Sequence, residues 1–457
     1  MGVKLAGSLR HKFLRDTSTL QVGAALNSAG NFFSAVALSH LLGARAQGEY
    51  YIAIALYSFL FFFLNPALSV VTVAQAAAAL ARDQHAKAAS WLGYLVKAYA
   101  ALGILVALVA AALLPTVGAA WVGSEARIGW LAALLAVTPL VELPRVVACA
   151  GLQAARRMRP LAQIENSQEL VRVFLVVVGA LVTRDPLGPV IGTISGSLAG
   201  SVLAIDVYRR EAQRRDSVLP SWRQVLRYVG PVPLTHGLRL GLRLGMVQNL
   251  TALGTQILPS LFVQRFGATE WVTYLRIAQR LLAVPLHFMQ GISRTALAAF
   301  SELAGRKDLA AMCRTYFRAS FLSGVLISAV IVTGWAVLPW LLGSLFPADY
   351  VEPVRTLYLI LMPGYMAVAF SVANDSFYVA IDKLRVGILV SLVGTVPYIV
   401  LVGSLAWLYP TVGAAFGLSL SMFWSFWHLA YAAFWFRRHL RREARGAPPI
   451  ASAQRGE

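Results

Sequence analysis

Residues 91–115 read WLGYLVKAYAALGILVALVAAALLP, a run in which Lys97 is the single charged side chain. A helix that crosses the hydrocarbon core of a bilayer needs about 20 consecutive, mostly apolar residues. Runs of this kind recur from one end of the chain to the other, and the whole chain is 58% hydrophobic and 13% charged. Because soluble domains carry about twice that share of charged residues, the sequence predicts an all-α membrane protein whose surface faces lipid.

Twelve membrane spans are predicted from these runs, and the loops between them are short. The expected spans are 17–42, 51–80, 91–115, 128–154, 161–183, 187–208, 229–264, 271–300, 314–342, 354–381, 386–408 and 411–436. The termini and alternate loops, with Arg314 and Arg318 at the start of the span 314–342, hold 27 of the 40 Lys and Arg residues, whereas the opposite loops hold five. Because cytoplasmic loops carry the excess of basic residues, we expect a bacterial inner-membrane protein with both termini in the cytoplasm.

A short glycine and tyrosine pattern occurs twice, about half the chain apart. Gly43 precedes Tyr50 by seven residues, and Gly267 precedes Tyr274 by the same spacing, at an offset of 224. Two further pairs of segments match at offsets of 226 and 221, namely 155–159 with 381–385 and 190–193 with 411–414. The shared order and the nearly constant offset indicate an internal repeat.

The repeat predicts how the chain is organised. We expect one six-helix half over residues 1–222, a second over 223–436 and a basic cytoplasmic tail over 437–457. Each half has an even number of spans, so the two repeats are expected to be parallel. Transporters built from such repeats bind their substrate near the bilayer midplane, between the halves. A central cavity is therefore predicted there.

The turn after the first span carries a resemblance to a known family. Leu42-Gly43, followed by Gly48 and Tyr50, resembles the corresponding turn of the Wzx-type polysaccharide flippases, and so does Gly151-Leu-Gln-Ala before the basic turn at Arg156. These O-antigen and exopolysaccharide flippases share a superfamily with the MATE drug exporters and the lipid II flippases. The resemblance covers nearly the whole chain, in its length and in the spacing of its loops. It implies alternating access, with an undecaprenyl-pyrophosphate-linked oligosaccharide or polysaccharide repeat unit as cargo.

Two features depart from that family pattern. His40 stands before Leu-Leu-Gly, where family members often have arginine, and the sequence does not assign it a role. The lipid II flippases usually carry two further spans, whereas here the last span is followed by the polar tail that begins with Arg437 and Arg438. The tail therefore argues against the lipid II branch.

Several arginines fall inside the predicted spans, where facing lipid would cost about 2.5–3.5 kcal/mol each. In the eighth span, Arg276, Arg280 and His287 lie on one helical face, and in the seventh span Arg239 and Arg243 are one turn apart. No acidic residue lies within four positions of these arginines. Since the planar guanidinium binds phosphate through two parallel hydrogen bonds, we predict that these residues bind the pyrophosphate in the cavity. A structural role, capping carbonyls or pairing with an acid, is the alternative.

Other polar residues in the spans are candidates for the same substrate site. Arg145 and Arg172 could contact substrate, or could be neutralised by acids three residues earlier in the chain. Asn27 and Asn31 lie on one face of the first span and could bind sugar hydroxyls or join helices by hydrogen bonds. Asp375 is a candidate for coupling to a proton or sodium ion, with a salt bridge to a cavity arginine as the alternative.

Other function classes fit the sequence less well than a flippase does. A MATE-like cation-coupled exporter is the main alternative, although a cationic lining would repel cationic drugs. A membrane enzyme of surface-glycan assembly is disfavoured by the short external loops. The chain has no G-x-x-x-x-G-K-[ST], no H-E-x-x-H and no Cys-His metal spacing, so neither catalysis, a cofactor nor a metal site is expected. Basic residues spread over separate loops do not form a nucleic-acid-binding face. The expected partners are the lipid-linked glycan, membrane lipid, and glycan polymerase and export proteins.

Overall fold

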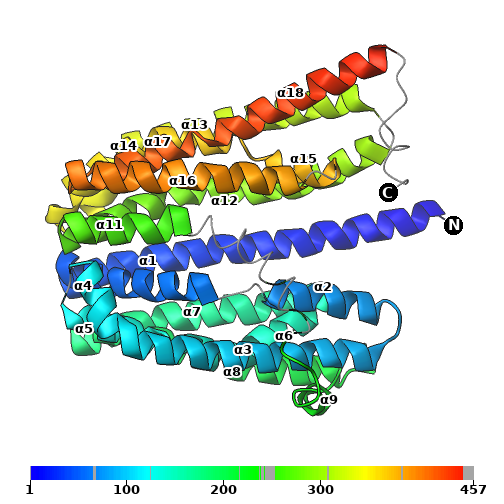
Figure 1. The fold of residues 1–457 in the computed structure, drawn as a ribbon, viewed down its shortest axis with the longest axis horizontal. Coiled ribbons are helices and arrows are strands. Elements are labelled where there is room, and N and C mark those ends of the chain that lie inside the picture. The colour runs from blue at the N-terminus through cyan, green and yellow to red at the C-terminus, as the bar shows by residue number, and fades with distance from the viewer. Residues whose placement is uncertain are drawn as a thin grey trace. The chain divides into compact units, whose positions relative to one another are not determined.

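A computed structural model describes residues 2–64, 68–123, 125–215, 217–235, 237, 241, 253–305, 308–381 and 384–445. Over these residues the regular structure is helical. The first part of the chain forms α1 (Gly2–Leu64), α2 (Leu68–Leu80), α3 (His85–Leu113), η1 (Leu114–Gly118), α4 (Ala119–Trp121), α5 (Ala126–Leu135), α6 (Thr138–Ala154), α7 (Met158–Thr183), α8 (Leu187–Ala212) and α9 (Trp222–Arg227). The remainder forms η2 (Leu253–Ile257), α11 (Leu258–Phe266), α12 (Thr269–Gly305), α13 (Leu309–Leu345), α14 (Ala348–Ala369), α15 (Asn374–Ala380), α16 (Leu384–Leu408), α17 (Gly413–Met422) and α18 (Ser425–Ala444) (Figure 1).

The described helices include segments long and apolar enough to cross a bilayer. Five helical segments meet both requirements: His85–Trp121, Ala126–Ala154, Met158–Thr183, Leu187–Ala212 and Leu309–Leu345. Two shorter apolar helices cover Leu68–Leu80 and Leu392–Leu408. Many large apolar side chains also lie on the surface, where lipid rather than water is the matching solvent. The prediction of an all-α membrane protein is confirmed.

The first two predicted spans are joined at a glycine. Gly43 lies inside α1 with φ 73° and ψ 171°, so two helical arms meet there at a sharp turn (Figure 1). A residue with a side chain would be strained at this positive φ. The predicted span 128–154 is likewise interrupted, because α5 and α6 are separated by a turn at Ala136 and Val137.

The chain forms two compact units. The first contains Met1–Ile277 with Leu345–Pro347, and the second contains Ala278–Ser344 with Ala348–Glu457. These units are defined by compactness, whereas the division at 222/223 counts spans, so the two six-helix halves stay a prediction.

Within the first unit, α7 and α8 lie side by side along most of their length (Figure 1). Glycines on α8 allow this approach. A Cβ at Gly192 would lie 2.4 Å from the Leu175 carbonyl oxygen, and one at Gly196 would lie 2.6 Å from the Arg172 Cα. These contacts are far below van der Waals distance, so a larger side chain would separate the helices. Gly192, Gly196 and Gly200 form a repeated G-x-x-x-G in the sequence. This spacing predicts a packing face, as small residues in membrane helices commonly provide, and α7 packs against it.

The two copies of the repeated turn contact each other in the first unit. The Thr273 hydroxyl donates to the Ala44 carbonyl at 2.7 Å. A Cβ at Gly48 would lie 2.2 Å from the Thr269 carbonyl oxygen. Gly43 and Gly267 both lie where one helical arm ends and the next begins, but with different backbone conformations, since φ is 73° at Gly43 and −121° at Gly267.

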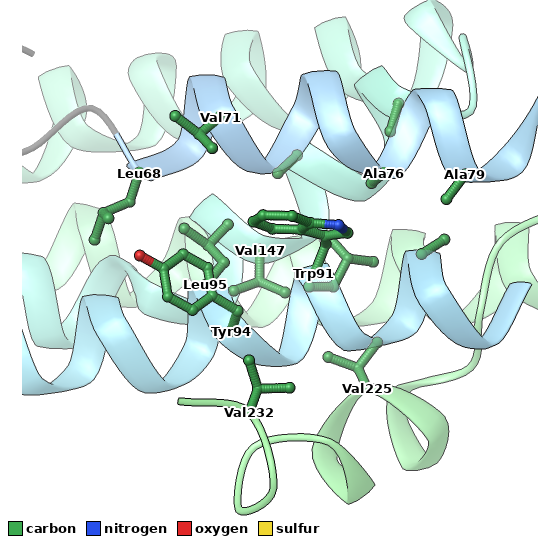
Figure 2. Packing of buried hydrophobic residues seen from close by; sticks show 14 of the residues in the cluster. Leu68, Val71, Ala76, Ala79, Trp91, Tyr94, Leu95, Val147, Val225 and Val232 are labelled. Carbon is green, nitrogen blue, oxygen red and sulfur yellow. The ribbon is translucent and has the colours of Figure 1, made fainter. Parts of the chain in front are cut away.

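A hydrophobic cluster in the first unit joins α2, α3, α6 and the segment around α9 (Figure 2). Trp91 and Tyr94 of α3 lie between α2 on one side and α9 with the following segment on the other. Val225 and Val232 of the same cluster lie below them in this view. The cluster anchors the segment that links the first six predicted spans to the next.

The opposite end of the first unit carries ion pairs between three predicted outer loops. Arg45 lies 3.8 Å from Glu125, and Arg127 pairs with Asp185. Partial burial alone would raise the pKa of Asp185. Hydrogen bonds from the Arg127 side chain and the Leu187 N–H, together with the positive charge of Arg127, outweigh this effect and lower the pKa. These loops therefore meet at one end, as alternating spans require.

The Asp185 pair is expected to contribute pH-dependent stability. A carboxyl group whose pKa is lower in the folded state stabilises the fold above its unfolded pKa, ordinarily 3.8. The contribution is lost as the pH falls through the lower folded value. Because both partners are partly exposed, we expect Asp185→Asn to cost less than about 1 kcal/mol at pH 7. Thermal unfolding in detergent measures this. A difference between wild type and variant that stayed the same at pH 7 and pH 2 would contradict the pairing.

Candidate functional site

Polar side chains from four helices of the first unit meet in its interior. Arg172 on α7 donates from Nε to Glu169 at 2.9 Å and also donates to it from Nη2. Asn31 on α1 donates to Glu169 at 2.6 Å and accepts from Arg172 at 3.2 Å. The three side chains thus form a closed network between α1 and α7.

A second carboxylate connects α7 with two further helices, α6 and α8. Glu142 on α6 accepts from Arg145 at 2.7 Å, from Gln168 of α7 at 3.1 Å and from Ser197 of α8 at 2.8 Å. Together with the network around Glu169, these groups are called here the polar cluster. Its members are Asn31, Glu142, Arg145, Gln168, Glu169, Arg172 and Ser197.

The polar cluster lies at mid-helix depth. Asn31 is twelve residues before Gly43, Arg172 eleven before Thr183, and Ser197 ten after Leu187. At a rise of 1.5 Å per residue, all three are about 15–18 Å from the end of the unit that carries the loop ion pairs. This is about half the thickness of a bilayer hydrocarbon core.

The glycine stripe of α8 determines which residues can meet. Gly196 lies against Arg172, and Gly200 lies so close to Gln168 that a Cβ would be 2.4 Å from its Cγ. Ser197, next in sequence to Gly196, then reaches Glu142 on α6. Small residues on α8 therefore allow α7 and α8 to pack closely. Because the two helices are close, Glu142 can accept hydrogen bonds from both of them.

The cluster is neither sealed nor fully satisfied. The side chains of the Glu142–Arg145 pair are 20% and 21% exposed, and those of the Glu169–Arg172 pair are 19% and 25% exposed. Arg145 Nε in the cluster and Oδ1 of Asn27, one turn before Asn31, are buried without a hydrogen-bond partner in the described part of the chain. Unsatisfied buried polar groups commonly indicate a water or ligand, so these two atoms have unused hydrogen-bonding capacity.

The predicted substrate residues fall into three groups. Arg145 and Arg172 form the i, i+3 ion pairs that the sequence left as an alternative, and Asn31 joins the second pair. Asn27 accepts from Asn31 Nδ2 through its backbone carbonyl at 2.9 Å. These four lie near one another, which the sequence did not show.

The α12 residues form the second group. The Arg276 guanidinium lies over the Tyr51 ring at 6.0 Å, within the range of a cation–π contact. Arg280 lies one turn further along α12 and is half-buried.

His40, to which the sequence assigned no role, lies on α1. Its Nε2 atom is 2.9 Å from the Leu345 carbonyl oxygen.

The third group cannot be placed. Arg239 and Arg243 lie outside the described residues, and so do the side chains of His287 on α12 and Asp375 on α15. Asn374, the neighbour of Asp375, accepts from the Tyr316 hydroxyl at 2.5 Å. Pyrophosphate binding and ion coupling by the third group stay predictions.

No known protein family and no curated protein matches this sequence. Solved structures do match. A multidrug resistance MATE family transporter in an inward-facing conformation aligns over 90% of this chain and 95% of its own, with a TM-score of 0.71 and 14% identity. The lipid II flippase MurJ, in an inward closed conformation, aligns over 89% and 87%, with a TM-score of 0.64 and 15% identity.

The chain has the fold of the MATE transporters and MurJ. A eukaryotic MATE transporter also aligns, over 92% of this chain and 96% of its own, with a TM-score of 0.59 and 14% identity. At such low identities the similarity describes the fold alone. The MATE and MurJ fold accounts for the multi-pass membrane architecture predicted from the apolar runs.

Sequence reasoning missed Gln168 and Ser197 as members of the site. It also treated Glu142 and Glu169 only as partners of nearby arginines. Two signals were available: a glutamine in an apolar span, and the glycine stripe that indicated close packing of 187–208 on a neighbouring helix. Neither signal shows that Glu142 reaches across to both helices, because that depends on how the helices are rotated.

Proposed function

We propose that this protein is a flippase that moves an undecaprenyl-pyrophosphate-linked oligosaccharide or polysaccharide repeat unit across the bacterial inner membrane by alternating access. The observation that carries this proposal is the polar cluster at mid-helix depth, in which Glu142 and Glu169 are each paired with an arginine. A site for cationic drugs needs free carboxylates, whereas these two are neutralised. The MATE and MurJ fold supports transport in general.

The chemistry of the cluster suits a sugar. Paired carboxylates still have lone pairs that accept from hydroxyls, and amides such as those of Asn31 and Gln168 both donate and accept. The unsatisfied Asn27 Oδ1 and Arg145 Nε add an acceptor and a donor. In this proposal Arg276 and Arg280 of α12, with Arg239 and Arg243, bind the pyrophosphate. The lipid tail stays in the membrane, and both termini face the cytoplasm, where the basic residues of the termini and alternate loops also lie.

One observation favours the alternative, a cation-coupled small-molecule exporter. Glu165 of α7 interacts electrostatically with Arg145, which gives the region a third carboxylate for two arginines. A surplus carboxylate is what binding of a proton, a sodium ion or a cationic substrate would use.

Reconstitution separates the two functions. The purified protein in vesicles is given a fluorescent lipid-linked pyrophosphate oligosaccharide, and in a parallel sample a cationic dye with a proton or sodium gradient. We expect the lipid-linked sugar to reach the opposite leaflet and the dye to stay where it was added. Dye transport driven by the gradient, with no movement of the lipid-linked sugar, would instead establish the exporter.

A further inference from the structure

Helix α18 has two different faces. One packs into the core of the second unit, where Ala432, Trp435 and Phe436 are 0%, 9% and 1% exposed. Trp435 and Phe436 contact the Phe377 ring, with centroids 5.6 Å and 5.1 Å apart. This face holds the helix in place, so its other face has a defined position.

The outer face of α18 borders an apolar groove shared with α16. The groove encloses about 530 Å³ and is lined by Leu389, Val390, Val393, Trp424, Trp427, Ala430, Tyr431 and Phe434. Trp424 is fixed there because its indole N–H donates to the Val390 carbonyl at 3.0 Å. Gly394 leaves room for that ring, since a Cβ would lie 2.3 Å from the indole nitrogen. The groove is therefore a formed feature of the fold.

A basic cavity continues the groove along the same helix. It encloses about 540 Å³ and is lined by Phe434, Arg437, Arg438, Arg441, Arg442 and Arg445. Phe434 lines both cavities and is 61% exposed. The five arginines are exposed, and no ion pair involves them within the described ranges.

Helical spacing places the aromatic residues of the groove and the arginines of the basic cavity on one face of α18. Positions 427, 431, 434, 438, 441 and 445 are alternately four and three residues apart, the spacing of a single helical stripe. The stripe is aromatic up to Phe434 and basic from Arg438 onwards. An amphiphile with its tail in the groove would thus have its head at the arginines.

We propose that this face of α18 binds an anionic glycerophospholipid with two phosphate groups, of the cardiolipin type. An acyl chain occupies the apolar groove, and the phosphates are bound by the arginines. Arginine forks bind phosphate oxygens in pairs, and basic pockets at the cytoplasmic ends of membrane helices bind such headgroups. Five arginines against the single acid Glu443 match two phosphates better than a zwitterionic headgroup.

Native mass spectrometry of the full chain tests this with three defined lipids: cardiolipin, phosphatidylglycerol and phosphatidylcholine. The test variant replaces Arg438, Arg441 and Arg445 by glutamine. Its matched control replaces Arg209, Arg210 and Arg214, which removes the same charge from a segment where Arg210 and Arg214 pair with Asp206 and Glu211. Wild type and control are expected to retain cardiolipin at concentrations at least tenfold below those needed for phosphatidylcholine. The test variant should lose this preference.

A second variant examines the groove without changing charge. Phe434→Ser is expected to weaken cardiolipin retention severalfold, because the residue links the apolar and basic parts. Equal loss in the arginine variant and its control would overturn the proposal. Tighter retention of an added polyprenyl pyrophosphate than of cardiolipin would also overturn it and would identify a docking site for a prenyl lipid. Thermal unfolding of each variant shows whether it is folded. If the arginine variant does not fold, cardiolipin retention by the Phe434→Ser variant tests the proposal.

Discussion

Replacing Glu142 by glutamine is expected to destabilise the protein on the order of 3 kcal/mol and to abolish transport. Glu142 accepts hydrogen bonds from Arg145, Gln168 and Ser197, so it joins α6, α7 and α8. The variant leaves the Arg145 charge, whose side chain is 21% exposed, without the acid to which it is hydrogen-bonded. Removing one partner of a buried ion pair typically costs 3–5 kcal/mol because the other charge remains desolvated.

The double variant Glu142→Gln with Arg145→Gln separates structure from function. Two amides of similar size hydrogen-bond without a net charge, so most of the lost stability should return. Transport should not return, because the substrate would meet a site with altered donors and acceptors. Thermal unfolding in detergent and the vesicle assay measure the two effects. The matched control is Glu125→Gln, since Glu125 is 75% exposed and pairs with Arg45 at the surface. Normal stability and transport in the Glu142→Gln single variant would show that the cluster has neither role.

Arg280→Ala is expected to reduce transport of the lipid-linked sugar at least 100-fold while leaving normal amounts of protein in the membrane. Arg280 lies eleven residues into α12, half-buried, and one turn beyond Arg276. Loss of a desolvated charged contact to a ligand costs about 2–5 kcal/mol, and 2.8 kcal/mol corresponds to about 100-fold.

Arg280→Lys distinguishes charge from geometry. Lysine keeps the charge but not the planar fork that binds phosphate through two bonds, so partial transport is expected. Arg45→Ala is the control, because the Arg45 side chain is 69% exposed in the loop ion pairs. If Arg280→Ala transported the lipid-linked sugar at the wild-type rate, the pyrophosphate assignment would be wrong and Arg280 would be a structural residue.

The sequence alone was sufficient for the class of the protein and for the five described helices that are long and apolar enough to cross a bilayer. Hydrophobicity is a property of each residue and adds along the chain, so runs such as 91–115 predict spans without any knowledge of the fold. The packing role of closely spaced glycines was also predictable from the sequence. The stripe at Gly192 and Gly196 packs against α7, as its small-residue spacing predicts. The i, i+3 pairs were anticipated for the same reason, because helical spacing alone brings Glu142 near Arg145.

The polar cluster and the face of α18 were decided by tertiary structure. Glu142 meets Ser197 across 55 positions, and Asn31 meets Glu169 across 138. Such contacts depend on the rotation and crossing of helices, which side-chain packing determines and sequence spacing does not. The arginines at the end of α18 looked like an ordinary cytoplasmic tail in the sequence. They border a groove only because α16 lies beside α18 and Gly394 admits the ring of Trp424.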